Sequence, residues 1–426
     1  MGNNSGYKYV IIGNSAAAVG TVEGIRRIDT AGSILIISDE PHHTYGRPLI
    51  SYLLLGKTDR QRMKYRPDDF YEKNGVTTKL GVAVTKINPD EHTVETADGE
   101  TIAYEKLMVS TGSNPFVPPM DGLDAVANKF TFQNLDSALA LGEAITSESD
   151  VLIIGAGLIG LKCAEGIIDR VRSVTFVDMA PKVLPSILED DAAAIIKAQL
   201  EAVGINFYLG DSVGSFDGNV ATLKNGGEKL TFDVLVLAVG VRPSIALVKD
   251  AGGACGRAIT VDSRSATSLP DVYAAGDCTE SRDAVTGDTK VMAILPNAYL
   301  QGETAGINMA GVNYAFEKLI PCNAIGFFGK HILSAGSYTG DVYFTNDGTN
   351  YRKLFYSDNR LNGFILIGDK HPKDGEIPAY DRAGIYTRII RERIPLDSLD
   401  FELIRDRPGL AAFSRAARGE LLGGEQ

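Results

Sequence analysis

The stretch "DVLIIGAGLIGLKCAEGIID", residues 150–169, decides the fold of this chain. Four apolar residues typical of a buried parallel strand lead into Gly155, Gly157 and Gly160, and a helical pattern follows. In this G-x-G-x-x-G spacing the first glycine permits a tight turn and the second lets the backbone approach a pyrophosphate. The third glycine permits close packing of the helix on the strand. The stretch therefore predicts a strand–turn–helix unit that binds a dinucleotide at the N-terminus of its helix.

The strand expected after this helix, "SVTFVD" (173–178), ends on Asp178. A carboxylate at this place accepts hydrogen bonds from both ribose hydroxyls of NAD and repels the 2′-phosphate of NADP. The next four residues, "MAPK", include no arginine, although Lys182 could reach a phosphate. The pattern favours NAD(H) and leaves NADP(H) as the alternative.

A less regular unit, "YKYVIIGNSAAAVG" (7–20), comes first in the chain. Gly13 permits the turn, but Ser15 and Ala18 stand where the second and third glycines are expected. Ala18 can still pack against the strand, and the Ser15 hydroxyl can donate to a phosphate oxygen. Asp39, which follows "SILIIS", is a candidate ribose ligand. Read by itself, this stretch is either a second phosphate-binding turn or a structural corner.

Three later strand-like runs also break at glycine: "STGSNP" (110–115), "AVGVRPS" (238–244) and "SLPDVYAAGDCTE" (268–280). At the carboxyl edge of a parallel sheet, Asp277 would accept hydrogen bonds from ligand hydroxyls. Pro296 opens a predicted helix whose N-terminus favours negative charge. The repeated strand–turn–helix pattern predicts an α/β fold with parallel sheets.

Composition narrows the class of protein. The 426 residues exceed one usual hydrophobic core, and the net charge of −12 argues against a nucleic-acid partner. No apolar run is long enough to span a membrane, and no export signal opens the sequence, so we expect a cytoplasmic protein. The four cysteines are isolated from one another, which predicts neither a metal site nor a local redox disulfide.

Over residues 7–315 the motifs follow one another in this order: the first glycine turn, "TG", the second glycine turn, "GVRP", "YAAGD" and "PNA…QG". This order resembles that of the FAD- and NAD-dependent pyridine nucleotide oxidoreductases. The remainder is similar to the small C-terminal domains of NADH:rubredoxin reductases, nitrite-reductase flavin subunits and NADH:acceptor subunits of aldehyde or 2-oxoacid oxidoreductases. The resemblance implies two Rossmann-like dinucleotide-binding domains and a small α+β C-terminal domain. The implied boundaries are an FAD-binding domain over 1–116 and 245–318, an NAD-binding domain over 117–244, and an acceptor-docking domain over 319–426.

The resemblance also implies site residues. The implied FAD contacts are Gly13, Ser15, Ala18, Asp39, Arg47, Pro48, Val84, Thr111, Gly112, Gly276, Asp277 and Leu295. The implied NAD(H) contacts are Gly155, Gly157, Ile159, Gly160, Asp178 and Gly240.

Two departures from the family pattern narrow the chemistry. Disulfide reductases carry a cysteine pair soon after the FAD turn, whereas this chain has no cysteine before Cys163. The motif "HPKDGE" (371–376) imitates their acid–base pair but is interpreted as a surface loop. Ferredoxin-reductase relatives carry a lysine and a glutamate where this chain has Tyr52 and Lys162. Our hypothesis is that Lys162 lies near N5 of the flavin and either stabilises reduced flavin or orients the nicotinamide; the alternative is an exposed helix lysine.

The sequence thus predicts an FAD enzyme that exchanges hydride with NAD(H) and passes electrons to a redox protein without a cysteine relay. The implied acceptor is rubredoxin, ferredoxin or an iron–sulfur subunit of a larger complex. Two alternatives stay open: an NADH oxidase or peroxidase, and an NADH-responsive flavoprotein with a binding or assembly role. The arginine-rich helix predicted over 380–394 is either a docking site for an acidic carrier or a helix with local ion pairs. The identity of the acceptor, the physiological direction of electron transfer and the oligomeric state are left open.

Overall fold

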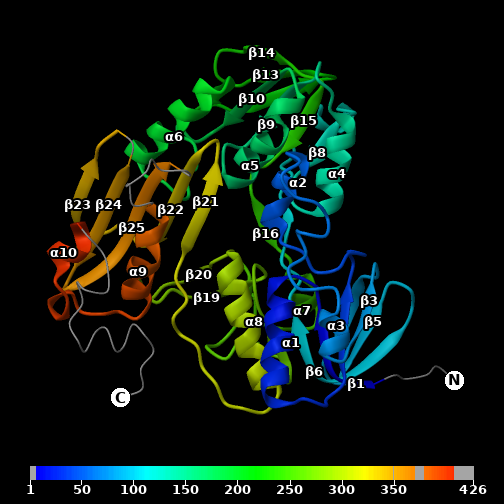
Figure 1. Ribbon diagram of the computed structural model, residues 1–426. Coiled ribbons are helices and arrows are strands. Elements are labelled where there is room, and N and C mark those ends of the chain that lie inside the picture. Colours follow the sequence, from blue (N-terminus) through cyan, green and yellow to red (C-terminus); the bar gives the residue numbers. More distant parts are fainter. Residues whose placement is uncertain (1–5, 349, 370–378, 407–426) are drawn as a thin grey trace. The chain divides into compact units, whose positions relative to one another are not determined.

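The computed structural model describes residues 6–348, 350–369 and 379–406 (Figure 1). These residues divide into two compact units. Unit 1 consists of the described residues up to Pro185 together with Leu200–Ser281 and Thr289–Phe316. Unit 2 consists of Ser186–Gln199, Arg282–Asp288 and the described residues from Glu317 onward. The three-domain boundaries expected from the sequence stay a prediction.

The first sheet of unit 1 is parallel at its centre, in the order β3-β2-β1-β6, with β18 on the far side of β6. Side chains of β1 alternate between two apolar clusters, so both faces of the strand are buried, as a parallel sheet requires. The hairpin predicted at Asp98–Gly99 is confirmed, since β5 and β6 pair antiparallel around it. The strands are β1 (Gly6–Ile12), β2 (Ile34–Ser38), β3 (Val76–Leu80), β4 (Val84–Asn88), β5 (Thr93–Thr96), β6 (Thr101–Val109) and β18 (Val272–Ala274).

The second sheet of unit 1 is wholly parallel, in the order β11-β10-β9-β15-β8. A three-stranded meander, β12-β13-β14, packs its apolar side chains on one face, and its turn lies at the predicted Asn225–Gly227 hairpin. The strands are β8 (Lys129–Thr131), β9 (Asp150–Ile154), β10 (Ser173–Asp178), β11 (Ile205–Leu209), β12 (Val213–Asp217), β13 (Val220–Leu223), β14 (Lys229–Thr231) and β15 (Val234–Leu237).

Shorter elements connect the two sheets of unit 1. The strands β7 (Ser113–Pro115) and β16 (Val241–Pro243) form an antiparallel pair, and both leave the carboxyl edge of a parallel strand. The other strands are β17 (Ile259–Thr260), β19 (Thr279–Arg282) and β20 (Thr289–Val291). The helices are η1 (Arg47–Leu49), α2 (Ile50–Leu54), α3 (Phe70–Lys73), η2 (Leu123–Ala125), α4 (Leu135–Ala144), α5 (Leu158–Ile167), η3 (Ile168–Arg170) and α7 (Ala246–Asp250). Helix α6 (Asp190–Ala202) lies mostly in the part of the chain assigned to unit 2.

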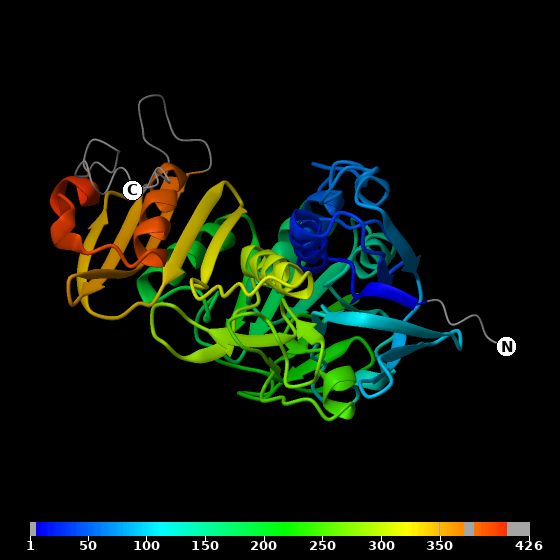
Figure 2. The same ribbon diagram turned by 90° about the horizontal axis from the view of Figure 1, so that it is seen from below.

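The helices α1 (Ala16–Ile28) and α8 (Leu295–Met309) touch backbone to backbone and lie side by side in Figure 2. Two glycines four residues apart on each helix make this possible. A Cβ added at any of the four would lie closer than 3.0 Å to a carbonyl oxygen of the facing helix, a separation that real Cβ atoms essentially never show. The pairs are Gly20 with Tyr299, Gly24 with Glu303, Gly302 with Ala17 and Gly306 with Thr21. Numbers rise together along both helices, so they run parallel and begin at the same end.

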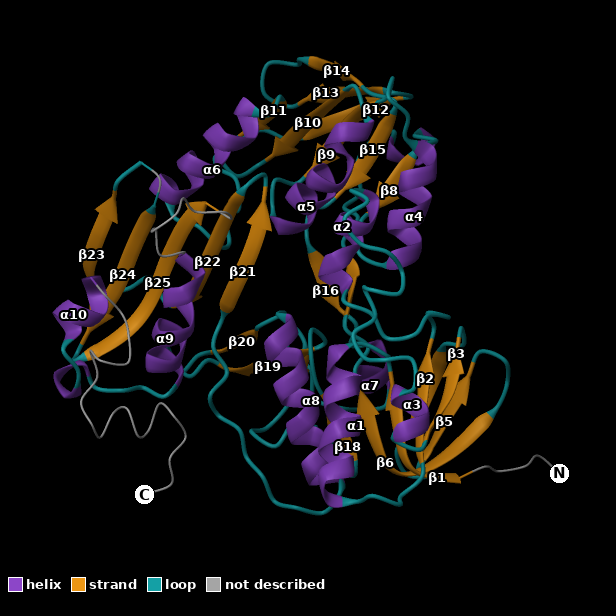
Figure 3. Ribbon diagram, in the orientation of Figure 1, coloured by secondary structure: helices purple, strands orange, loops and turns teal. Residues whose placement is uncertain are grey.

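Unit 2 is built on an antiparallel sheet in the order β21-β22-β25-β24-β23, and Figure 3 shows α9 lying against it. Asp358 and Asn359 both have positive φ at the predicted turn between β24 and β25. An antiparallel sheet with a helix on one face confirms the expected α+β character of this part. The elements are β21 (Cys322–Phe327), β22 (Lys330–Gly336), β23 (Asp341–Asn346), β24 (Tyr351–Ser357), β25 (Arg360–Asp369), α9 (Ala379–Arg391), η4 (Leu396–Ser398) and α10 (Phe401–Asp406).

The α1–α8 contact gives a stability prediction. We expect Gly302→Ala to lower the free energy of unfolding by about 2–3 kcal/mol, because the added methyl group must push two backbones apart. Urea or thermal unfolding followed by circular dichroism measures this change. The matched control is Gly384→Ala, at an exposed position of α9 with open space around an added Cβ. The free energy of unfolding of this control should rise by about 0.5–1 kcal/mol. An unchanged unfolding curve for Gly302→Ala would contradict the close contact.

Candidate functional site

The glycine turn between β9 and α5 has the geometry that its sequence predicts. Gly155 has φ +110°, and a Cβ there would lie closer than 3.0 Å to the Ala238 carbonyl oxygen. A Cβ at Gly160 would collide with the Gly155 carbonyl oxygen in the same way. The fold itself therefore requires glycine at these two positions. Gly157 differs, because a Cβ added there meets no atom within 4 Å.

The open space beside Gly157 fits a ligand that approaches the backbone. Gly157 is the N-cap residue of α5 and has no side chain to satisfy the free N–H groups of the first turn. Such a helix N-terminus accepts the negative charge of a pyrophosphate. Ile159 lies in this first turn and is half-buried. Gly240, which directly precedes β16, also faces open space. These residues together fit one end of a dinucleotide.

Asp178 lies at the carboxyl end of β10, beside this turn. Its Oδ2 atom accepts a hydrogen bond from the Ala156 N–H at 2.6 Å, and its Oδ1 atom accepts one from the Ala180 N–H at 2.7 Å. Because β9, β10 and β15 are paired in parallel, their carboxyl ends meet at one edge of the sheet. The structure therefore brings together the carboxylate and the turn that the sequence predicted to act together.

The first turn is built on the same plan. Gly13 has φ +104°, and a Cβ there would collide with the Ser110 carbonyl oxygen. Ser15 is the N-cap residue of α1, yet its hydroxyl forms no hydrogen bond with a described residue. This hydroxyl is available to a phosphate oxygen. Ala18 is fully buried, which shows that this helix tolerates a methyl group where the second turn requires glycine.

Asp277 follows β18 at the same edge of the first sheet. No described residue donates a hydrogen bond to its carboxylate, and burial raises the pKa of this group while Arg47 opposes the rise. A partly enclosed carboxylate without a protein donor fits a ligand with hydroxyl groups. The preceding Gly276 donates its N–H to Oε1 of Gln301 on α8 at 2.9 Å, which fixes the strand end to that helix.

Other predicted contacts lie around this edge. Thr111 donates its hydroxyl to the Ser244 carbonyl oxygen at 2.8 Å, and Gly112 faces open space. Leu295 is the first residue of α8, and Val84 is the first residue of β4. Pro48 lies in η1 next to Arg47.

Arg47 is held by a small polar network. Its guanidinium pairs with the Glu40 carboxylate and donates to the Gln133 carbonyl oxygen at 3.3 Å. Burial opposes the charge, but the neighbouring Tyr45 and Glu40 raise the pKa of Arg47 above its usual value. Tyr45 also donates its hydroxyl to Glu40 at 2.6 Å. Sequence reasoning missed Glu40 as the anchor of this arginine.

The strand register identifies a second residue that sequence reasoning missed. Ile12 pairs with Ile37 in the first sheet as Ile154 pairs with Val177 in the second. Ser38 is therefore the positional equivalent of Asp178. Its Oγ atom accepts from the N–H two residues later, as Asp178 does. Asp39 lies one residue further along and is exposed, and its contact with a ribose stays a prediction.

Tyr52 and Lys162 lie in contact, although they are far apart in sequence. The Lys162 Nζ atom lies 4.1 Å from the centroid of the Tyr52 ring and pairs with the carboxylate of Glu165. The side chains of Lys162 and Glu165 are only 15% and 9% exposed. Burial lowers the pKa of Lys162, and Glu165 opposes this change. Lys162 is therefore not an exposed helix lysine. The i,i+3 spacing on α5 could have revealed Glu165 from the sequence.

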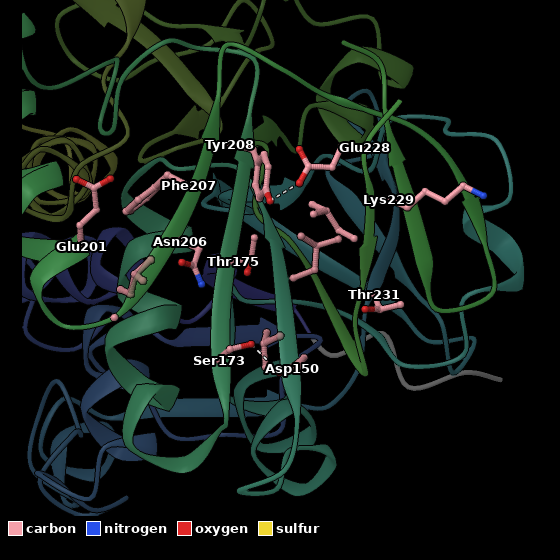
Figure 4. Close-up of a pocket in the computed structure, with 15 residues that line it drawn as sticks. Asp150, Ser173, Thr175, Glu201, Asn206, Phe207, Tyr208, Glu228, Lys229 and Thr231 are labelled. Atoms are coloured by element: carbon pink, nitrogen blue, oxygen red, sulfur yellow. Dashed lines mark hydrogen bonds between the residues drawn. The ribbon is translucent and has the colours of Figure 1, made fainter. Parts of the chain in front are cut away.

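A groove of about 870 Å³ lies on the second sheet, between β9–β11 and β14 (Figure 4). Tyr208 donates its hydroxyl to Glu228 at 2.7 Å within it. The groove reaches Asp150 and Ser173, which are the first residues of β9 and β10. It contains none of the predicted site residues and is not the dinucleotide site.

The arginine-rich helix has local partners. Arg388 is exposed and lies 3.7 Å from Glu392, while Arg391 and Arg393 are half-buried. This arrangement favours a structural role over docking. The side chain of Arg382 and the motif at 371–376 lie outside the described residues.

The described residues contain neither a candidate metal cluster nor a candidate membrane-spanning helix. No group of three or more His, Cys, Asp or Glu side chains in the described ranges is arranged to hold a metal ion. Every helix in those ranges is too short or too polar to cross a lipid bilayer.

Comparisons with known proteins agree with this geometry. A family model described as "Pyridine nucleotide-disulphide oxidoreductase" matches residues 7–302. The epsilon subunit of NADH-dependent phenylglyoxylate dehydrogenase from Aromatoleum evansii is 34% identical over 378 residues, or 85% of this chain and 88% of that protein. NADH-rubredoxin oxidoreductase from Clostridium acetobutylicum is 25% identical over 366 residues, or 85% of this chain and 91% of that protein.

The fold is also found among solved structures. The covalent complex of putidaredoxin reductase with putidaredoxin matches with a TM-score of 0.83 and 20% identity, covering 99% of both chains. FAD and NAD(P)H are the cofactors of the matched family. The chain therefore belongs to the pyridine nucleotide-disulphide oxidoreductase family and is an NAD(P)H-dependent oxidoreductase of the flavoprotein type.

Proposed function

We propose that this chain is an FAD-dependent NADH:acceptor oxidoreductase that exchanges electrons with a redox protein or an iron–sulfur subunit. One observation carries the proposal: two carboxylates, Asp277 and Asp178, lie at the carboxyl edges of two parallel sheets of one unit, each sheet with its own glycine turn. The family binds FAD and NAD(P)H, which matches two dinucleotide sites in one unit. A bound FAD would supply the chemistry that links two-electron hydride exchange with the nicotinamide to one-electron transfer with a carrier.

The cysteines of unit 1 support a route without a thiol relay. Among its described residues, no cysteine lies in either glycine turn. Cys163 and Cys278 are fully buried, and burial raises the pKa of the Cys278 thiol to about 11. Burial also raises the pKa of Cys163. Cys255 of unit 1 is half-buried, and burial raises the pKa of its thiol as well, so none of these three thiols has the low pKa of a redox-active cysteine.

The protein groups supply electrostatic support for a reduced, negatively charged flavin. The N-terminus of α8 at Leu295 carries the positive end of a helix dipole and is held beside α1 by the glycine contact. Lys162 contributes a second positive charge in a partly buried place. Ser15, Arg47 and Asp277 would hold the cofactor through its phosphate and hydroxyl groups.

The relatives support a protein acceptor. The first relative is named as the epsilon subunit of an NADH-dependent dehydrogenase, and the second relative is named for rubredoxin. We therefore propose that this chain works either with a small carrier or as the NADH-linked subunit of a larger enzyme. Electrons would pass from NADH to the acceptor or in the reverse direction.

The test is to purify the chain, identify its flavin, and mix it anaerobically with NADH. We expect stoichiometric FAD, rapid bleaching of the flavin by NADH, and electron transfer to ferricyanide and to a rubredoxin or ferredoxin. Oxygen consumption as fast as carrier reduction would favour an NADH oxidase instead. Slow turnover with every acceptor, together with NADH-dependent dimerisation in size-exclusion chromatography, would favour an assembly role.

Asp178 gives a prediction on nucleotide choice. We expect Asp178→Asn to lower kcat/KM for NADH by about 10- to 100-fold, because a charged acceptor for the ribose hydroxyls is lost. The value for NADPH should change much less, since repulsion of its 2′-phosphate is also removed. The asparagine oxygen can still accept from the Ala156 N–H, but its NH2 group cannot accept from the Ala180 N–H, so the turn loses one of its two hydrogen bonds to this side chain. Asp169→Asn, at an exposed carboxylate beyond α5, is the matched control and should leave both values unchanged. Equal losses of kcat/KM for NADH and NADPH would contradict the assignment of Asp178 as the acceptor for the ribose hydroxyls.

Lys162 gives a prediction on pH dependence. Its charged form faces Glu165 on its own helix and the Tyr52 ring on α2. Burial places its pKa below that of an ordinary lysine, so the rate of flavin reduction should be high at neutral pH and fall as pH rises through this pKa. Glu165→Gln removes the carboxylate that opposes the lowering of the Lys162 pKa. The fall in the rate of flavin reduction should therefore move to lower pH.

Anaerobic stopped-flow between about pH 7 and 10.5 measures these profiles. Lys162→Met should be slow at every pH and should lower the flavin potential. Lys249→Met, at an exposed lysine of α7, is the control and should keep the wild-type profile. An unchanged rate and potential for Lys162→Met would remove the hypothesis.

A further inference from the structure

Residues 57–66, "KTDRQRMKYR", form a concentrated patch of positive charge on an acidic protein. The segment contains five cations and one carboxylate, Asp59, whereas the whole chain has a net charge of −12. We call it the basic segment. It follows α2 in unit 1. Its cations are Lys57, Arg60, Arg62, Lys64 and Arg66.

Much of this charge is exposed and loosely compensated. Lys57 and Arg60 are exposed, and neither side chain forms an ion pair with a described residue. Arg62 is 72% exposed, and its ion-pair partner among the described residues is Asp59 of its own segment. An exposed pair of this kind contributes little to stability. The positive charges at this end are therefore available to a partner.

The other end of the basic segment is rigidly anchored. Arg66 makes two hydrogen bonds to Glu23 on α1, at 2.6 and 3.1 Å, and lies over the Tyr65 and Tyr299 rings. Lys64 binds Asp68 and donates to the Gln61 side chain at 2.7 Å. The segment is therefore a fixed surface rather than a free tail.

The anchoring also places the segment beside the predicted flavin contacts. Gly46 donates its N–H to the Met63 carbonyl oxygen at 2.8 Å, and Tyr65 donates to the Thr44 carbonyl oxygen at 3.0 Å. These bonds join the segment to the strand-like stretch that leads directly into Arg47. The anchored end of the basic segment therefore lies one backbone spacing from the stretch that leads into Arg47 and the residues expected along FAD.

Other charged surfaces fit an acidic carrier less well. The groove in Figure 4 is lined by Asp150, Glu201 and Glu228 with Lys229 as its one cation, so it would repel an acidic surface. The arginines at the end of α9 are half-buried or paired with Glu392. The basic segment combines exposure, excess positive charge and closeness to the expected cofactor.

We propose that the basic segment is the docking surface for the acidic face of an electron-carrier protein. This inference rests on the proposed function, because it assumes that electrons leave the flavin for a protein. The negative charge of the rest of the chain repels an acidic carrier and the segment attracts it, so the carrier is steered to one place. Attraction of this kind raises the association rate and weakens as salt is added.

The experiment uses the holoenzyme and two acidic probes, a rubredoxin and a [2Fe–2S] ferredoxin. The variant is Lys57→Glu with Arg60→Glu, which reverses two exposed charges that have no partner to lose. The matched control is Lys249→Glu with Arg257→Glu, which makes the same change of charge at two exposed positions of unit 1. NADH-dependent reduction of each carrier is measured at low and high ionic strength, with ferricyanide as the small acceptor.

We expect kcat/KM for carrier reduction at low salt to fall at least about 10-fold in the test variant and less than twofold in the control. The salt dependence should also weaken, and ferricyanide reduction should stay unchanged in both variants. Carbodiimide coupling of wild-type enzyme to the carrier should give cross-links at Lys57 or Lys64.

Each contrary result has a distinct meaning. Equal losses in the two variants, or carrier reduction that is unaffected by the test variant, overturn the docking surface and leave the proposed function intact. Ferricyanide reduction without reduction of either carrier by the wild-type enzyme also overturns the docking surface. Absence of NADH-dependent ferricyanide reduction contradicts the proposed function itself.

Discussion

The contact between α1 and α8 is the constraint on which the candidate site depends. Glycines on both helices let the two backbones touch, and the parallel direction brings both N-termini to one edge of the first sheet. Helix N-termini carry partial positive charge, so this packing concentrates positive potential where no lysine or arginine is needed. The strand end at Gly276 is tied to the same helix pair through Gln301. The packing of these two helices thereby fixes the position of the protein groups that are candidates for binding the cofactor.

A second constraint is the cost of burying charge. Lys162, Glu165, Arg47 and Glu40 are all partly or largely withdrawn from solvent, and each has an opposite charge beside it. An unpaired charge in these places would be strongly disfavoured. The stacked Tyr52 ring adds a favourable contact for the lysine ammonium.

Much of the fold and part of the candidate site could be predicted from the sequence. The glycine turns, the parallel strands and the hairpins at Asp98–Gly99 and Asp358–Asn359 follow from local spacing and turn chemistry. The family resemblance correctly implied an NAD(P)H-dependent flavin oxidoreductase. Glu40, Ser38 and Glu165 were missed, because their importance depends on which strand or helix face stands opposite them.

The sequence by itself determined which segments become strands, turns and helices, because those choices depend on residues within a few positions of one another. It also determined the excess of positive charge in residues 57–66. Only the tertiary structure decided that Tyr52 stacks on Lys162, that Ser38 rather than Asp39 is the equivalent of Asp178, and that the basic segment is joined to the stretch before Arg47. These are contacts between residues distant in the chain, and they are set by strand register and helix packing, which local sequence does not encode.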